Sequence, residues 1–307
     1  MNIAGPILVT GATGAQGGAV VDALLDAGAD VRALVRNPQS ATAAQLAERG
    51  VDLVRGDFED PESLTKAVDG TYGVFSMQMP PTPKDPEVEV RTGRALVAAA
   101  RTAGVEVFVH TSVARAGDHE KFAGWAEQRW WPVYWLSKAA VNDIVRSAGF
   151  PKWVVLKPAF MMDNFIPPKS HYLFPPLAAG RLHTALADDT RMHLIAAADV
   201  GRFAAAAFAD PDRHHGQEID LAADALTMAE VAQVISAITT VPISVKGLPR
   251  DEAIASGTSS LVVGNQEWAN VEGYAVDLDV ARSRGIALER FADWANRHAD
   301  QFDIAPS

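Results

Sequence analysis

The chain has 307 residues, of which 48% are apolar and 21% are charged. It is therefore long and apolar enough to bury a large core. Its formal net charge of −11 repels phosphate backbones, so we expect no nucleic-acid partner. The absence of cysteine excludes disulfides and thiol nucleophiles, and the histidines show no ligand spacing, so we expect no metal site.

The sequence has no segment typical of a targeting signal or a membrane span. The apolar run at 7–10 leads directly into a glycine turn, which leaves no room for a signal peptide. No uncharged apolar stretch reaches the roughly 18 residues of a membrane helix. We therefore expect a soluble, cytoplasmic protein with no membrane partner. The oligomeric state is not indicated.

The first half of the sequence alternates short β-rich runs with longer helical patterns. Strands are expected at 7–10, 31–35, 51–54, 73–76, 105–110 and 153–156. Helices are expected at 18–27, 41–49, 61–68, 87–103 and 137–149, with Asp60 capping the third. This order predicts an α/β fold, a Rossmann doubly wound parallel sheet with helices on both faces.

The second half is less regular and predicts a small C-terminal α/β substrate domain. Residues 165–182 are rich in proline and aromatic side chains and are expected to form a pocket-lining loop. The other expected elements are a helix at 200–208 capped by Asp199, a helix at 228–238 capped by Thr227, a strand at 242–245 and a closing helix at 286–301. We place the Rossmann domain at 1–157, with a return segment near 195–222, and the substrate region at 158–307.

A GxxGxxG motif at residues 11–17 separates the first strand from the first helix. Phosphate groups need close backbone approach and free N–H groups at a helix N-terminus, and glycine allows both. Such a motif can also be a plain strand–helix turn, but its position favours a dinucleotide site. The residues expected to bind the cofactor here are Gly11, Thr13, Gly14, Ala15, Gln16 and Gly17.

The type of cofactor is indicated where the second strand ends. An NAD-specific site places Asp or Glu there to hold the ribose 2′-hydroxyl. This sequence has Arg36 instead, and an arginine can bind a 2′-phosphate bidentately. Arg36 could also be an ordinary surface residue. We predict NADP(H) as the cofactor.

Further cofactor contacts are expected where later strands end. Asp57 and Phe58 follow the third strand, where Asp57 could accept a hydrogen bond from adenine or could instead cap a helix. Ser76 and Met77 end the fourth strand, where the chain passes the cofactor. Pro158 follows the sixth strand.

Several short motifs, in this order and spacing, resemble one known family. They lie at residues 8–14, 36–38, 56–58, 157–164, 199–202 and 273–277. Together they resemble the NmrA-like family of atypical short-chain dehydrogenases/reductases, over nearly the whole chain. The resemblance implies a Rossmann domain, a small C-terminal domain and a substrate cleft between them. It also implies either of two functions, because some members are NADP(H)-binding regulators and others reduce quinones or dyes.

Residues 134–138 form a YxxxK motif, and a spacing of four on a helix puts Tyr134 and Lys138 on one face. In the wider dehydrogenase superfamily the tyrosine is the general acid/base, and the lysine lowers its pKa and holds the ribose. A partner serine follows the fifth strand, where this chain has Ser112, with Thr111 as the fallback if Ser112 points away. A tyrosine with its free pKa of about 10 needs such a nearby cation.

The substrate region is expected to be apolar. A tryptophan-rich segment at 118–135 could be a substrate lid or a surface helix that packs its tryptophans inward. Apolar walls suit flat hydrophobic substrates, although plain core has the same composition. The residues expected to contact the substrate are Trp131, Trp135, Phe160, Met161 and Asn164.

These patterns favour an NADPH-dependent reductase of a hydrophobic quinone or carbonyl compound, with Tyr134 supplying the proton. The alternative is a non-catalytic NADP(H) sensor that acts through a protein partner. An epimerase or dehydratase is disfavoured because the sequence shows no sugar-nucleotide site.

Overall fold

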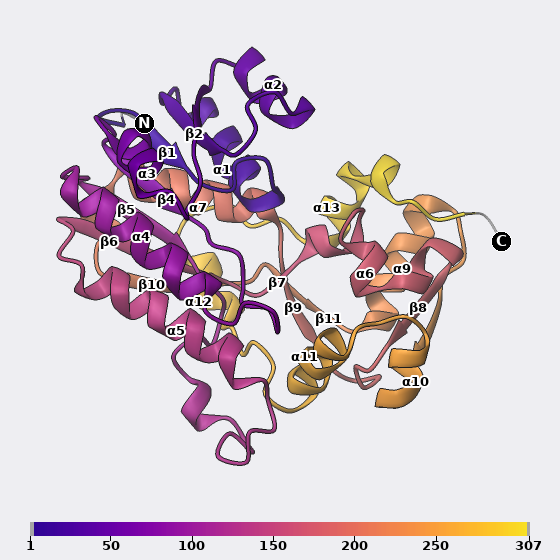
Figure 1. Ribbon diagram of the computed structural model, residues 1–307. Helices are drawn as coiled ribbons and strands as arrows, with labels where there is room; N and C mark the ends of the chain where they lie inside the picture. The colour runs from indigo at the N-terminus through magenta and orange to yellow at the C-terminus, as the bar shows by residue number, and fades with distance from the viewer. Residues whose placement is uncertain (1–2, 306–307) are drawn as a thin grey trace. The chain divides into compact units, whose positions relative to one another are not determined.

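The chain folds into two compact units. The computed structural model describes residues 3–305. The first unit contains the described residues up to Gly117, together with Val133–Pro158 and Ala197–Asp220. The second unit contains Asp118–Pro132, Ala159–Ala196 and the described residues from Leu221 onward. Each unit is therefore assembled from segments that are distant in the sequence (Figure 1).

The first unit is built on a sheet whose strands, in the described part of the chain, follow the order β10-β6-β5-β4-β1-β2-β3. The strands are β1 (Ile7–Val9), β2 (Val31–Val35), β3 (Asp52–Arg55), β4 (Gly73–Ser76), β5 (Val107–Thr111), β6 (Lys152–Pro158) and β10 (Gln217–Leu221). All pairs from β6 to β3 are parallel. The order reverses between β1 and β4, where open α/β sheets bind their ligands. The predicted Rossmann fold is confirmed.

Helices cover both faces of this sheet. They are α1 (Ala15–Asp26), α2 (Ala41–Glu48), α3 (Pro61–Val68), α4 (Val88–Thr102), α5 (Pro132–Ser147), α7 (Ala197–Ala209) and α8 (Pro211–His214). Val74 packs in a buried cluster with α3, α4 and α5. Its neighbour Gly73 faces Phe208 of α7, which therefore covers the other face because strand residues alternate. Helix α7 packs so closely on α1 that a Cβ at Gly201 would lie 2.3 Å from the Ala19 carbonyl oxygen.

Two of the three predicted helix caps are confirmed. Asp60 accepts hydrogen bonds from backbone N–H groups of the first turn of α3. Thr227 forms a capping box at the start of α9 (Met228–Thr239). The prediction that Asp199 is an N-cap is wrong, because α7 begins before it. Asp199 is instead buried in the first turn, where its carboxylate pairs with Arg202.

The second unit contains two small sheets in its described residues, with the orders β11-β9-β7 and β12-β8. Their strands are β7 (Phe160–Met161), β8 (Arg181–Thr184), β9 (Met192–Ile195), β11 (Asp224–Leu226) and β12 (Ser244–Gly247). The remaining helices are α6 (Ser170–Leu173), α9, α10 (Arg250–Ala255), α11 (Ser260–Val271), α12 (Leu278–Ser283) and α13 (Phe291–Arg297). Short 3-10 helices are η1 (His119–Lys121), η2 (Met162–Phe165), η3 (Pro175–Ala179) and η4 (Ala299–Gln301).

The segment at 165–182, expected to be a pocket-lining loop, forms short helices and a strand, and its Leu173 and Phe174 line a cavity of about 40 Å³ in the second unit. Phe165 and Phe174 are buried and stack with their ring centroids 5.1 Å apart. Phe165 also meets Phe291 of α13 edge-on at 5.5 Å. Phe165 therefore packs against aromatic side chains from both ends of the second unit's sequence, whereas Tyr172 of the same segment is exposed.

Two helices differ most from their expected bounds. Helix α5 begins at Pro132 rather than at 137, and proline at the first helical position is the signal that indicates this start. Helix α13 covers only part of 286–301, because its buried face begins at Phe291. Within residues 3–305, no helix combines the length and the apolar character needed to cross a bilayer.

Candidate functional site

The glycine motif forms a tight turn between β1 and α1. Gly11 has a φ of +67°, which favours glycine, and its carbonyl oxygen accepts a hydrogen bond of 2.9 Å from the Gly14 N–H. A Cβ at Gly17 would lie 2.2 Å from that same oxygen. Helix α1 can therefore begin this close to the turn only with glycine at position 17.

The N-terminal end of α1 is open to an anion. Gly14 precedes the helix without a side-chain cap, and the first turn contains no acid. Thr13, Gly14 and Ala15 are exposed, and Gln16 is partly exposed. A groove of about 490 Å³ runs beside the turn, between α1 and α2. Free N–H groups and the positive end of the helix dipole fit a pyrophosphate here.

Arg36 is exposed at the end of β2. Between residues 3 and 305, its guanidinium has no hydrogen-bond or ion-pair partner. Arg32 on the same strand is different, since it donates a 2.8 Å hydrogen bond to Asp52. Of the two arginines in β2 and directly after it, Arg36 is thus the one whose N–H donors are all free to bind a phosphate.

Asp57 lies in the turn after β3, and it caps no helix. Its Oδ1 accepts a hydrogen bond of 2.9 Å from the Glu59 N–H, whereas Asp60 caps α3. Phe58 is partly buried against the cluster beneath α3 and α4. One carboxylate oxygen of Asp57 therefore closes the turn, and the alternative that Asp57 is a helix cap is excluded.

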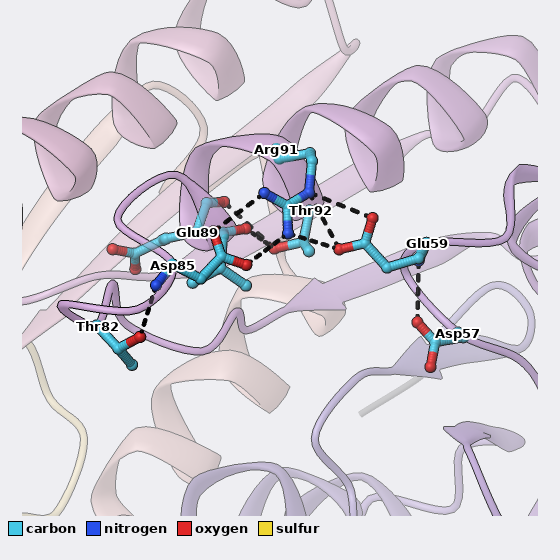
Figure 2. Close-up of polar contacts among 8 residues, drawn as sticks. Asp57, Glu59, Thr82, Asp85, Glu89, Arg91 and Thr92 are labelled. Carbon is cyan, nitrogen blue, oxygen red and sulfur yellow. Dashed lines mark hydrogen bonds and ion pairs between the residues drawn. The ribbon is translucent and has the colours of Figure 1, made fainter.

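Arg91, in the first turn of α4, joins the turn after β3 to the loop after β4. Figure 2 shows its guanidinium between Glu59 and Asp85, and the shortest N···O distance is 2.8 Å on each side. Hydrogen bonds to Asp85 and Glu59 raise the pKa of Arg91 above its ordinary value. Single exposed ion pairs contribute little to stability, but the guanidinium of Arg91 bridges two acids and so joins the two loops beside the predicted adenine site.

Thr10 fixes the end of β4 beside the glycine turn. Its hydroxyl accepts a 2.8 Å hydrogen bond from the Met77 N–H. A Cβ on Gly11 would lie 2.4 Å from Cε of Met77, so this side chain lies against the turn. Ser76 is buried, and its hydroxyl accepts a hydrogen bond from Nε2 of Gln78, so it does not reach the surface. Pro158 is buried at the end of β6.

Tyr134 and Lys138 lie one turn apart on α5. The Lys138 Nζ lies 5.7 Å from the centroid of the Tyr134 ring. Lys138 is buried, and its Nζ lies 2.5 Å from Oε1 of Glu89 on α4. The other Glu89 oxygen accepts a 2.7 Å hydrogen bond from the Ser137 hydroxyl. The lysine of the YxxxK motif is thus held by a carboxylate from a neighbouring helix.

Glu89 is the site residue that sequence reasoning missed. An acid in the first turn of a helix is ordinarily explained by the helix dipole. Periodicity was the signal that could have found it, because Glu89 lies on the same helical stripe as the buried residues Gly93 and Leu96. An acid on a buried stripe needs a partner, but the sequence does not say which one.

The electrostatics of the site differ from those that the resemblance implies. Burial raises the pKa of the Tyr134 hydroxyl, and the negative charge of Glu89 raises it further. Burial, together with the charge of Lys138, lowers the pKa of His110 to about 3, so this imidazole is neutral at pH 7. The site therefore contains one paired carboxylate and ammonium beside a neutral phenol and a neutral imidazole.

The two candidate hydroxyls at the end of β5, those of Thr111 and Ser112, lie on opposite faces of the sheet. Thr111 donates a 2.8 Å hydrogen bond to Oε1 of Gln16, so it points toward α1. The Ser112 N–H still pairs with β6, so the extended backbone continues through this residue. Because side chains alternate along a strand, Ser112 lies on the same face as His110. The charge of Lys138 acts on His110, so Lys138 lies near this face. The Ser112 hydroxyl is buried and has no hydrogen-bond partner in the described part of the chain. Ser112, not Thr111, therefore shares a face with Lys138.

The expected substrate residues are divided between the two units. In the first, Trp135 is 3% exposed and its ring centroid lies 5.2 Å from that of Tyr134. In the second, Met161 is buried and Asn164 is partly buried. Phe160 lines a cavity of about 40 Å³ inside that unit. This cavity is far smaller than the pockets that hold drug-sized ligands.

Residues 118–131 of the tryptophan-rich segment consist of turns and η1 in the second unit, and residues 132–135 are the start of α5. Trp130 is buried, and its Nε1 donates a 2.9 Å hydrogen bond to the Ala123 carbonyl. The Trp125 ring lies 4.7 Å from the His119 ring. Trp131 is partly buried. Inward packing, one of the two alternatives, is thus observed for Trp130.

The fold is that of a Rossmann-type α/β protein, and its glycine turn is of the type that binds phosphate groups. The chain belongs to the NmrA-like family, whose model matches residues 4–281. The predicted family is therefore confirmed over nearly the whole chain. The match includes the glycine turn, the YxxxK motif and most of the second unit.

Individual relatives include both reductases and a regulator. The NAD(P)H azoreductase of Xenophilus azovorans is 29% identical, over 97% of this chain and 100% of the relative. The structure of the Citrobacter sp. triphenylmethane reductase complexed with NADP(H) has a TM-score of 0.76 at 21% identity, over 96% of this chain and 99% of that one. The structure of NmrA, a negative transcriptional regulator, in complex with NADP has a TM-score of 0.75 at 19% identity, over 96% and 95%. The two structures share the fold.

Proposed function

We propose that the protein is an NADP(H)-dependent reductase of a neutral, hydrophobic small molecule of the quinone, azo or carbonyl type. The observation that carries the proposal is the Tyr134–Lys138 pair, which lies in the same compact unit as the glycine turn. A sensor needs the turn but has no need of an acid beside it. The activity named for the azoreductase relative supports a reductase.

NADP(H) fits the residues of the first unit. The open end of α1 would hold the pyrophosphate, and Arg36, with all its donors open, would hold the 2′-phosphate. Lys138 has three N–H donors, of which Glu89 engages one, so donors remain for the ribose hydroxyls. When bound, the cofactor supplies a hydride.

The chain's own residues supply the proton. When a carbonyl carbon accepts a hydride, its oxygen becomes an alkoxide. The O–H bond of Tyr134 breaks, the proton goes to that oxygen to form the alcohol, and the phenolate recovers a proton from solvent. The raised pKa keeps Tyr134 protonated at neutral pH, and an alkoxide is basic enough to take its proton. Ser112, on the face of Lys138, would orient the substrate oxygen.

The charge and surroundings of the site favour a neutral acceptor. Its ammonium and carboxylate neutralise each other, and the net charge of −11 repels anions. The buried Trp135 ring packs edge-on against Tyr134, so the proton donor lies in apolar, aromatic surroundings. A flat, uncharged acceptor meets these conditions best.

NADPH oxidation, measured against a panel of quinones, azo dyes, aldehydes and ketones, tests the proposal. We expect oxidation with at least one hydrophobic acceptor, faster with NADPH than with NADH. Tight NADPH binding without oxidation by any member of the panel would contradict it and favour the sensor that acts through a protein partner.

A further inference from the structure

Glu89 is a buried acid whose contacts all lead to the YxxxK motif. Its side chain is 1% exposed. One oxygen lies 2.5 Å from the Lys138 Nζ and the other accepts a 2.7 Å hydrogen bond from Ser137. A buried carboxylate is costly unless it is paired and hydrogen-bonded. Both oxygens of Glu89 are satisfied by residues of one turn of α5.

In residues 3–305, the charged and titratable groups linked to Tyr134, directly or through Lys138, come from three elements. Lys138 on α5 lies 5.7 Å from the ring centroid. Glu89 on α4 is ionically paired with that lysine and acts on the phenol. His110 on β5 is neutral and interacts with Lys138. Among the described residues, Glu89 is thus the negative charge that raises the pKa of Tyr134, and it offsets the cation that would otherwise favour the phenolate.

We propose that Glu89 is a positioning residue of this site, which anchors the Lys138 ammonium beside Tyr134. In this position its negative charge also offsets that of the ammonium near the phenol. The value of this arrangement to a reductase rests on the proposed function, because the phenol is the form that can donate a proton. The two contacts themselves are independent of that function. Glu89 also gives the buried Lys138 ammonium a counter-charge.

Removal of the Glu89 charge should make Tyr134 easier to ionise. Glu89→Gln keeps the size of the side chain and can still accept from Lys138 or Ser137. It leaves the ammonium without a counter-charge beside the phenol, and a nearby uncompensated cation favours a phenolate. Glu87→Gln is the matched control, because Glu87 lies two residues earlier at the same helix start and is exposed.

NMR of the protein labelled with ¹³C at tyrosine Cζ measures the ionisation directly. The chain has four tyrosines, and the Tyr134 signal is the one absent from Tyr134→Phe. We expect the phenolate of Tyr134 to appear at a pH lower by about one unit or more in Glu89→Gln than in Glu87→Gln. Glu89→Asp, which retains the charge, should resemble the wild type. Equal titration in Glu89→Gln and Glu87→Gln would overturn the proposal.

A second comparison covers the case in which Glu89→Gln does not fold because Lys138 is left buried without a counter-charge. Lys138→Gln alone is then compared with Lys138→Gln combined with Glu89→Gln, which has no unpaired ammonium. The double variant should again ionise Tyr134 at lower pH, and no difference would contradict the role of Glu89. These titrations need no substrate. The two roles can therefore fail separately. If Glu89→Gln shifts the Tyr134 titration but Tyr134→Phe turns over substrate as fast as the wild type, Tyr134 is not the catalytic acid, and Glu89 keeps its positioning role.

Discussion

The Thr111 hydroxyl donates a hydrogen bond of 2.8 Å to Oε1 of Gln16. This contact joins the end of β5 to the first turn of α1, within the glycine motif. Thr111→Val should loosen the turn and weaken NADPH binding about 3- to 10-fold, the usual value of one hydrogen bond. Ser112→Ala should leave NADPH affinity unchanged and lower kcat on a carbonyl substrate. Titration with NADPH and steady-state kinetics on both variants separate the two roles, and the reverse pattern would exchange them.

Arg36 should determine the choice of cofactor. Because Arg36 has no partner in residues 3–305, Arg36→Ala removes a guanidinium available to the 2′-phosphate and little else. NADP(H) binding should weaken by about 1.5–3 kcal/mol while NAD(H) binding stays the same. Arg94→Ala, an exposed arginine on α4, is the matched control. Calorimetry with both cofactors checks this, and equal wild-type affinity for NADP(H) and NAD(H) would remove the argument.

Gly14 and Gly17 should respond differently to an added side chain. Gly14 has ordinary extended backbone, and its Cβ would approach the Gly11 oxygen no closer than 3.4 Å. Gly14→Val should therefore fold but lose both cofactors, because the side chain fills the place of the pyrophosphate. Gly17→Ala should instead lower the free energy of unfolding by about 1–3 kcal/mol, since its Cβ meets the Gly11 oxygen.

Urea unfolding and NADPH fluorescence titration on these two glycine variants distinguish the outcomes. A folded Gly14→Val that binds NADPH normally would place the phosphate site elsewhere. An unchanged stability of Gly17→Ala would show that the turn is looser than the structure has it.

The elements that depend on neighbouring residues in the sequence could be predicted, whereas those that depend on tertiary contacts could not. The bounds of β2 and β4 match the expected ones, because short apolar runs between turns are read directly from sequence. Asp60 and Thr227 cap helices as predicted, since a cap depends only on the next few residues. Asp199 does not, because its burial and its pairing with Arg202 depend on how α7 packs.

The residues of the candidate site show the same difference between local and tertiary determinants. The spacing of Tyr134 and Lys138 on one helix predicted their proximity. Glu89 could not be assigned to Lys138, because α4 and α5 are separate helices whose packing is set by the core beneath them. The choice between Thr111 and Ser112 likewise needed the strand register of β5.

Stability should fall in acid because His110 is buried in its neutral form. Its pKa is about 3 in the folded protein, against an ordinary value of 6.5. As the pH falls below 6.5, the unfolded chain binds a proton that the folded protein excludes, so stability is lost toward pH 3. The expected slope is up to about 1.4 kcal/mol per pH unit.

His110→Gln removes this dependence. Its free energy of unfolding, measured in urea, should vary less than that of the wild type as the pH is lowered through the weakly acidic range. The same slope in both proteins would show that other groups cause the loss.

The reductase account is tested most directly by NADPH-dependent reduction of a carbonyl substrate in the wild type and in Tyr134→Phe. The substitution removes one hydroxyl, so folding and NADPH affinity should barely change, and Tyr172→Phe, on the exposed Tyr172, is the control. We predict one molecule of alcohol formed for each NADPH oxidised, and a fall in kcat of about 10² or more in Tyr134→Phe. A quinone would show a smaller loss, because its reduced form can take protons from water. Equal kcat for the wild type and Tyr134→Phe on the carbonyl substrate would contradict the account.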